Sequence, residues 1–150
     1  GGYTELVLYW GFGMPLKPTL TSDDCFRAYL LIELLRSTGE REFPLQLASC
    51  LFYVMSHDGC RMGDLATATG LSSASVTRNI QWLGEQHRID DRPGLKLIRR
   101  EQDPDDYKRF RLFLTPKGKS WVNLVSNIHS MPLQTLKHHD EDDWESKNMG

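Results

Sequence analysis

The chain has 150 residues, of which 39% are hydrophobic and 25% charged. This composition is typical of a globular protein that can bury one core, and it excludes a disordered chain. No apolar run approaches the roughly 20 residues that a membrane span needs, and no signal peptide is recognisable, so no membrane association is predicted. Three cysteines without close pairing favour a reducing cytoplasm over a disulfide framework.

The net charge of −2 is distributed unevenly. Residues 60–120 hold 12 Lys and Arg against 8 Asp and Glu, a net +4, so the rest of the chain is acidic. A basic centre between acidic flanks suits a domain that presents one face to a polyanion such as a nucleic acid.

Two helices are predicted before this basic centre. Residues 1–20 form an apolar and aromatic arm, broken by glycine and proline, which we expect to pack on the domain or on a partner chain. A helix begins at Thr21-Ser22-Asp23-Asp24, where a hydroxyl cap precedes two acids, and ends at Gly39. A second helix, from Pro44 to Ser56, is apolar nearly all round and therefore belongs at the centre of the domain.

Two short helices, residues 63–69 and 73–86, come next, after a possible short strand at 60–62. Gly70 ends the first helix and Ser72 or Ser73 caps the second, which is the pattern of a helix-turn-helix. At 100° per residue, the buried side of the second helix holds Val76, Ile80 and Leu83. The opposite side and its flanks hold Ala74, Ser75, Thr77, Arg78, Gln81 and Trp82.

This outward side of the second helix fits a DNA groove. Its small residues allow close approach, and Arg78 and Gln81 can form paired hydrogen bonds with guanine and adenine edges. An ordinary solvated helix face explains the same residues, and the helix alone does not separate the two interpretations.

A basic hairpin follows, with strands predicted at residues 95–100 and 109–115 around a turn-rich tip at 102–108. Its five cations are Arg99, Arg100, Lys108, Arg109 and Arg111. Thr115 and Pro116 then begin a helix that Pro132 interrupts. A further short helix from Leu133 and an acidic tail at 140–145 complete the chain.

The order of these elements resembles that of the MarR-type winged-helix transcription regulators. DPDDYKRFRLFLTPKG, Asp103–Gly118, is similar to that family's wing signature, and LATATGLSSASVTRNIQWL, Leu65–Leu83, is similar to its helix-turn-helix pattern. The resemblance implies a mainly α fold with a small β-hairpin, a winged helix-turn-helix with flanking dimerisation helices. The expected parts are an arm (1–20), a winged-helix domain (21–131, DNA-binding core 60–121) and a C-terminal short helix and acidic tail (132–150).

The resemblance also implies roles for individual residues. Thr77 and Arg78 match positions that face DNA, and Asp106 matches an acid that orients the wing by pairing with a basic residue two positions on. That residue is Lys108 here, where the family has Arg, so Arg109 is the alternative cation for the minor groove. The joint at residues 84–94 is longer than in the family and is expected either to lengthen the second helix or to form a loop.

The expected function is sequence-specific binding of double-stranded DNA by a homodimeric transcription regulator, a repressor. We expect the protein to be bacterial, archaeal or phage-encoded, and to be cytoplasmic and associated with the nucleoid. The predicted DNA-binding residues are Ser73, Ser75, Thr77, Arg78, Gln81, Arg99, Lys108, Arg109 and Arg111. The alternative is a winged-helix module that binds protein.

Neither an enzyme nor a cofactor is expected, because no catalytic or phosphate-binding motif is present. His57 and Cys60 have a spacing seen in metal sites, but they lack a second pair, so no metal site is predicted. A small aromatic effector, held by Tyr29, Phe52 and Trp121, is a further possible partner. A packed core explains these three residues equally well, so no effector site is assigned.

Overall fold

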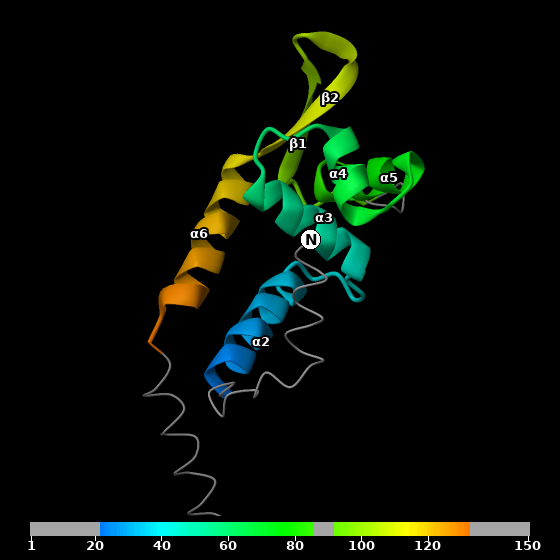
Figure 1. Cartoon of the computed structure of the whole chain (residues 1–150). Helices are drawn as coiled ribbons and strands as arrows, with labels where there is room; N and C mark the ends of the chain where they lie inside the picture. The colour runs from blue at the N-terminus through cyan, green and yellow to red at the C-terminus, as the bar shows by residue number, and fades with distance from the viewer. Residues whose placement is uncertain (1–21, 86–91, 133–150) are drawn as a thin grey trace, which may run out of the picture. The chain divides into compact units, whose positions relative to one another are not determined.

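The computed structural model describes residues 22–85 and 92–132. In this part of the chain the elements are, in order, α2 (Ser22–Arg36), α3 (Leu45–Ser56), α4 (Met62–Thr69), α5 (Ser73–Leu83), β1 (Ile98–Asp103), β2 (Asp106–Leu114) and α6 (Pro116–Ser130) (Figure 1). The predicted class, mainly α with one β-hairpin, is confirmed. The N-terminal arm, the short helix expected from residue 133 and the acidic tail lie outside the described residues. Of the helices described, none is long and apolar enough to cross a membrane.

The chain divides into two compact units, residues 33–127 and residues 1–32 with 128–150. In the described part of the second unit, the Arg27 guanidinium donates hydrogen bonds to the main-chain oxygens of Ile128 and Met131. Tyr29 and Ile32 are each 50% exposed on α2, as expected for a helix with more apolar surface than its own unit covers. The boundaries 1–20, 21–131 and 132–150 stay predictions.

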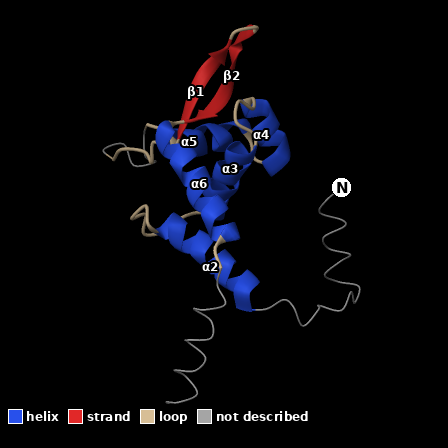
Figure 2. Cartoon of the chain, turned by 90° about the vertical axis from the view of Figure 1, so that its left-hand side faces the viewer, coloured by secondary structure: helices blue, strands red, loops and turns tan. Residues whose placement is uncertain are grey.

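Helix α3 lies at the centre of unit 33–127, as its nearly continuous apolar sequence predicts. Leu47, Cys50, Leu51 and Val54 are each 0% exposed. Burial of a side chain of this size contributes about 1.5–3 kcal/mol, so these positions anchor the core. Figure 2 shows α4 and α5 beside α3, with the β-hairpin projecting beyond all three helices.

The turns that bound α4 and α5 follow from local chemistry. Gly70 ends α4 in the left-handed conformation, with φ 70°, and its N–H donates to the Ala66 oxygen at 2.9 Å. Ser72 caps α5, because its hydroxyl oxygen accepts a hydrogen bond from the Ser75 N–H at 3.2 Å. The helix ends at Leu83, so the predicted extension to Gln86 is wrong.

The end of α5 is fixed by the chain that returns to it. Four N–H groups, from Gly94 to Leu97, donate to the oxygens of Glu85, Trp82, Gly84 and Leu83 at 2.8–2.9 Å. The long joint therefore does not lengthen the helix. The strand predicted to begin at Leu95 begins instead at Ile98, because residues 95–97 bond to the end of α5.

The wing is an antiparallel pair, with Ile98 opposite Leu114 at the base and Asp103 opposite Asp106 at the tip. The predicted tip of residues 102–108 was too long: its polar residues are typical of turns, yet all but residues 104 and 105 belong to β1 or β2. The strand expected at residues 60–62 is reduced to one bridge between Arg61 and Arg111.

Helix α6 docks on the segment that leads into β1. The Thr115 hydroxyl donates to the Lys96 oxygen at 2.6 Å, and the Lys117 ammonium donates to the Leu95 oxygen at 2.8 Å. Gly118 lies so close to this segment that an added Cβ would be 2.2 Å from the Leu97 oxygen. The Thr-Pro-Lys-Gly sequence thus joins the wing to the last helix.

Candidate nucleic-acid interface

The outer face of α5 is polar and free of acidic side chains. Ser73, Ala74, Arg78 and Gln81 are exposed, and Ser75 and Thr77 are half-buried. Val76, Ile80 and Leu83 are buried, as the helical periodicity predicts. The structure therefore brings the five predicted recognition residues, Ser73, Ser75, Thr77, Arg78 and Gln81, onto one helix.

Trp82 is placed differently from the prediction, which put it on the flank of the outer face. Its side chain is only 8% exposed, and its indole N–H donates to a carboxylate oxygen of Glu40 at 3.3 Å. A large aromatic ring gains more from burial than from solvation, and here its polar N–H also finds an acceptor.

Hydrogen bonds along α5 orient its cation. The Arg78 guanidinium donates to the Ser75 hydroxyl oxygen at 3.1 Å, one turn towards the helix N-terminus. The Thr77 hydroxyl donates to the Ser73 oxygen at 2.9 Å. The side chains of Ser75 and Arg78 thus lie along the same strip of the helix surface, where a base edge could meet both.

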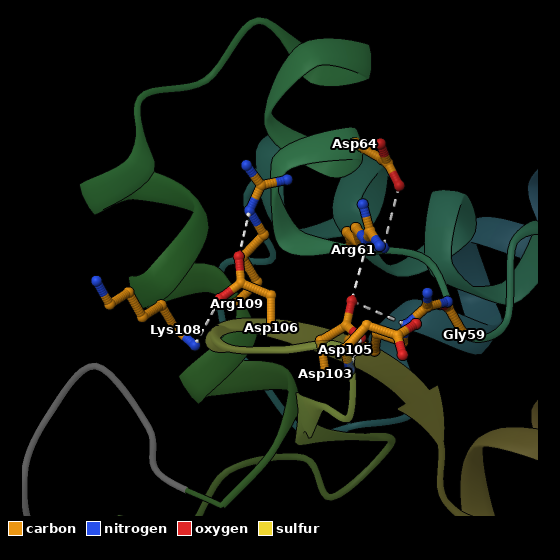
Figure 3. Close-up of polar contacts among 9 residues, drawn as sticks. Gly59, Arg61, Asp64, Asp103, Asp105, Asp106, Lys108 and Arg109 are labelled. Atoms are coloured by element: carbon orange, nitrogen blue, oxygen red, sulfur yellow. Dashed lines mark hydrogen bonds and ion pairs between the residues drawn. The ribbon is translucent and has the colours of Figure 1, made fainter.

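The wing tip carries a different pairing from the one that the resemblance implies. Asp106 accepts a hydrogen bond from the Lys108 main-chain N–H at 3.1 Å, but its ion pair, at 3.3 Å, is with Arg109. Figure 3 shows the Lys108 side chain running away from Asp106. The carboxylate therefore orders the main chain at Lys108 and the side chain at Arg109.

Two further arginines of the wing lie against aromatic rings. The Arg99 guanidinium is 4.8 Å from the centre of the Phe113 ring, and that of Arg100 is 4.5 Å from the Phe110 ring. Arg99 also forms an ion pair with Glu101. Such contacts limit the rotamers of long cationic side chains and leave the charge at the surface.

Two grooves flank the wing. The α4–wing groove has a volume of about 530 Å³ and is lined by Arg61, Met62, Gly63, Asp64, Thr67, Lys108, Arg109 and Phe110. The α5–wing groove has a volume of about 370 Å³ and is lined by Ile80, Gln81, Gly84, Glu85, Ile98, Arg99 and Arg100. Arg100, absent from the predicted site, thus faces the same groove as Gln81.

Arg111 and Asp103 form a site that the sequence did not predict. The Asp103 carboxylate is 0% exposed and accepts hydrogen bonds from Arg61 at 3.0 Å, from Arg111 at 3.3 Å and from the Asp105 N–H at 3.0 Å. The Asp105 N–H lowers the pKa of Asp103; burial opposes this shift, and the charges of Arg111 and Arg61 reinforce it. The Asp-Pro-Asp pattern predicts the turn but gives no signal of this burial.

Two of the three cysteine thiols, Cys50 and Cys60, are buried or half-buried. No group of three or more His, Cys, Asp or Glu residues there could hold a metal ion. Burial raises the pKa of both Cys50 and Cys60 to about 11, which keeps them protonated. Trp121 is 8% exposed within the core, in agreement with the packed-core interpretation of that residue.

Comparison with solved structures identifies the fold. No family model and no curated protein matches the chain. The crystal structure of MarR matches with 21% identity and a TM-score of 0.50, over 91% of this chain and 79% of MarR. The chain has the winged-helix fold of MarR.

Similar structures include that of MepR from S. aureus in a complex with DNA, with 18% identity over 83% of this chain and 99% of MepR, at a TM-score of 0.49. PcaV from Streptomyces coelicolor, in complex with its natural ligand, also has 18% identity, over 84% of this chain and 91% of PcaV, at a TM-score of 0.42.

Proposed function

We propose that this chain is a sequence-specific, double-stranded DNA-binding transcription regulator that acts as a homodimer. The observation that carries the proposal is the outer face of α5, where Arg78 and Gln81 are exposed and no acidic residue occurs in the helix. A helix of this kind fits the major groove, where arginine recognises guanine and glutamine recognises adenine.

The proposed roles divide between helix and wing. Base edges and nearby phosphates contact Ser73, Ser75, Thr77, Arg78 and Gln81. Lys108 and Arg109 enter the minor groove or follow the backbone, and Asp106 orients them. Arg99 and Arg111 are proposed backbone contacts, although each already has an acidic partner within the wing.

A homodimer would bind DNA with two-fold symmetry. The half-sites of its operator would then form a palindrome, with centres about one helical turn apart. Binding of such a dimer within a promoter excludes the polymerase, so repression is the expected outcome.

The proposal is tested by selecting bound sequences from a random DNA pool and measuring affinity by fluorescence anisotropy at several salt concentrations. Arg78→Ala should weaken operator binding by about 1–3 kcal/mol and relax the preference at one base position. Arg78→Lys keeps the charge but not the paired hydrogen bonds, so it should lose the base preference and retain the salt dependence. Lys119→Ala, an exposed cation on α6, serves as the control.

A second candidate is a winged-helix module that binds protein. It is favoured by the internal ion pairs of the wing, because Arg99, Arg109 and Arg111 each contact an acid of the hairpin. Absence of DNA binding at low as well as at high salt would refute the first proposal and leave the second. An equal loss for all sequences in Arg78→Ala would instead identify Arg78 as a phosphate contact.

A further inference from the structure

Asp103 is the only charged residue with a fully buried side chain in the part of the chain that the structure describes. A buried carboxylate is unfavourable unless hydrogen bonds and opposite charges compensate for lost hydration. Here two guanidinium groups and one N–H do so, at 3.0–3.3 Å. The cluster of Arg61, Asp103 and Arg111, which we name the wing clamp, therefore forms only when its three segments are close together. Figure 3 shows Arg61 and Asp103 facing each other.

The wing clamp joins the hairpin to the start of the helix-turn-helix. Asp103 ends β1 and Arg111 lies in β2, whereas Arg61 is the N-cap residue of α4. The Arg61 N–H also donates to the carboxylate of Asp64, in the first turn of α4, at 3.1 Å. One residue therefore both begins α4 and holds the wing.

Main-chain bonds support the same junction. The Gly59 N–H donates to the Leu112 oxygen at 2.7 Å, and the Leu112 N–H donates to the Cys60 oxygen at 2.8 Å. Arg111 also donates to the Gly59 oxygen at 3.3 Å. The loop before α4 thus runs alongside β2, on the edge that β1 does not occupy. The wing clamp lies where this loop meets α4.

The α5 side of the wing carries the second of the two grooves. Between α5 and β1 lies the α5–wing groove, with Gln81 on one wall and Arg100 on the other. Packing between α5 and the outer half of the hairpin is therefore incomplete. On the α4 side, the wing clamp and the main-chain bonds of Gly59, Cys60 and Leu112 hold the hairpin.

We propose that Asp103 is a positioning residue that sets the distance between α5 and the wing cations by clamping the hairpin to α4. This inference rests on the proposed function. The distance between α5 and the wing matters only if α5 contacts a major groove while the wing contacts the adjacent backbone of the same DNA. A wing held at the required angle before binding loses less conformational freedom on binding, which increases affinity. Asp103 and Arg61 act through the wing and do not themselves contact DNA.

The test uses the full-length chain with Asp103→Asn, which keeps the shape and the acceptor for the Asp105 N–H but removes the charge between the arginines. DNA affinity should fall by about tenfold. In the double variant with Lys108→Ala, the losses of affinity should not add, because an unclamped wing already contributes little to DNA binding. In the double variant with Arg78→Ala, on the helix, the two losses should add. Full additivity with Lys108→Ala would overturn the proposal.

A second readout does not involve DNA. Hydrogen exchange at the Gly59 and Leu112 N–H groups should accelerate in Asp103→Asn, because both bonds lie at the clamped junction. Unchanged exchange would overturn the proposal even if affinity fell. Conversely, if the wild type bound no DNA, the proposed function would fail, while exchange would still decide whether Asp103 holds the wing.

Two further variants complete the experiment. Arg61→Gln removes the ion pair to α4 and leaves the Asp103–Arg111 pair within the hairpin. It should also lower DNA affinity and accelerate the exchange of Gly59 and Leu112, and it replaces Asp103→Asn if that variant fails to fold. Glu101→Gln is the matched control, because Glu101 is an exposed wing acid whose ion pair with Arg99 stays within β1. It should leave the exchange of Gly59 and Leu112 unchanged.

Discussion

Replacing Gly118 with alanine should destabilise the winged helix by about 3 kcal/mol. The added Cβ would be 2.2 Å from the Leu97 oxygen, so α6 and the segment before β1 must separate by roughly 1 Å to restore an ordinary contact. That movement breaks or stretches three hydrogen bonds, in which Thr115 contributes two donors and Lys117 one. At about 1 kcal/mol for each bond, the loss is about 3 kcal/mol.

The assay is urea unfolding at equilibrium, followed by circular dichroism and by tryptophan fluorescence, since Trp82 and Trp121 are both buried. Gly63→Ala is the matched control: a Cβ there meets nothing within 4 Å, and alanine is favoured over glycine in a helix. It should therefore stabilise the protein by about 0.5–1 kcal/mol. A Gly118→Ala variant as stable as the wild type would refute the reasoning from close approach.

Three further outcomes are expected. Ser72→Ala should lower stability in urea unfolding by about 1 kcal/mol, whereas Ser72→Asn, which still caps α5, should not. The pKa of Asp103 is lowered in the folded protein, so its contribution to stability is complete above the ordinary carboxyl pKa and is lost as the pH falls through the folded pKa. In thermal unfolding at a series of pH values, the melting temperature of Asp103→Asn should therefore fall less steeply towards acid pH than that of the wild type. In the native protein at pH 8, iodoacetamide should modify exposed Cys25 while Cys50 and Cys60, with pKa values raised to about 11, react only after unfolding, as peptide mass mapping would show.

Local signals were enough to predict much of this fold. Helix α3 was predicted to within one residue of its observed bounds, because Pro44 immediately precedes it and its apolar residues continue to Ser56. Gly70 and Ser72 mark the turn of the helix-turn-helix through conformations that those residue types favour. Helical periodicity likewise placed the buried and exposed sides of α5, apart from Trp82.

The errors lie where distant segments decide the local structure. The chain at residues 95–97 has a strand-like composition, yet it bonds to the end of α5, which shortens both the helix and the strand. The wing clamp was missed for the same reason: Arg61 is 42 residues from Asp103, and no local pattern joins them. As a cation in a basic hairpin, Arg111 is a natural candidate for a DNA contact. Its ion pair with Asp103 can be recognised only in the three-dimensional structure.

The junction between Glu85 and Gly94 has a practical consequence for protein engineering. The Gly94 N–H donates to the Glu85 oxygen, and three more bonds connect residues 95–97 to residues 82–84. This ladder holds Glu85 and Gly94, at the two ends of the joint, next to each other. Lengthening a loop whose ends are already held together has a small entropic cost, about 0.6 kcal/mol for each doubling of its length. A peptide epitope or a reporter fluorophore could therefore be grafted between these two residues, close to α5, without disturbing the winged helix that carries it.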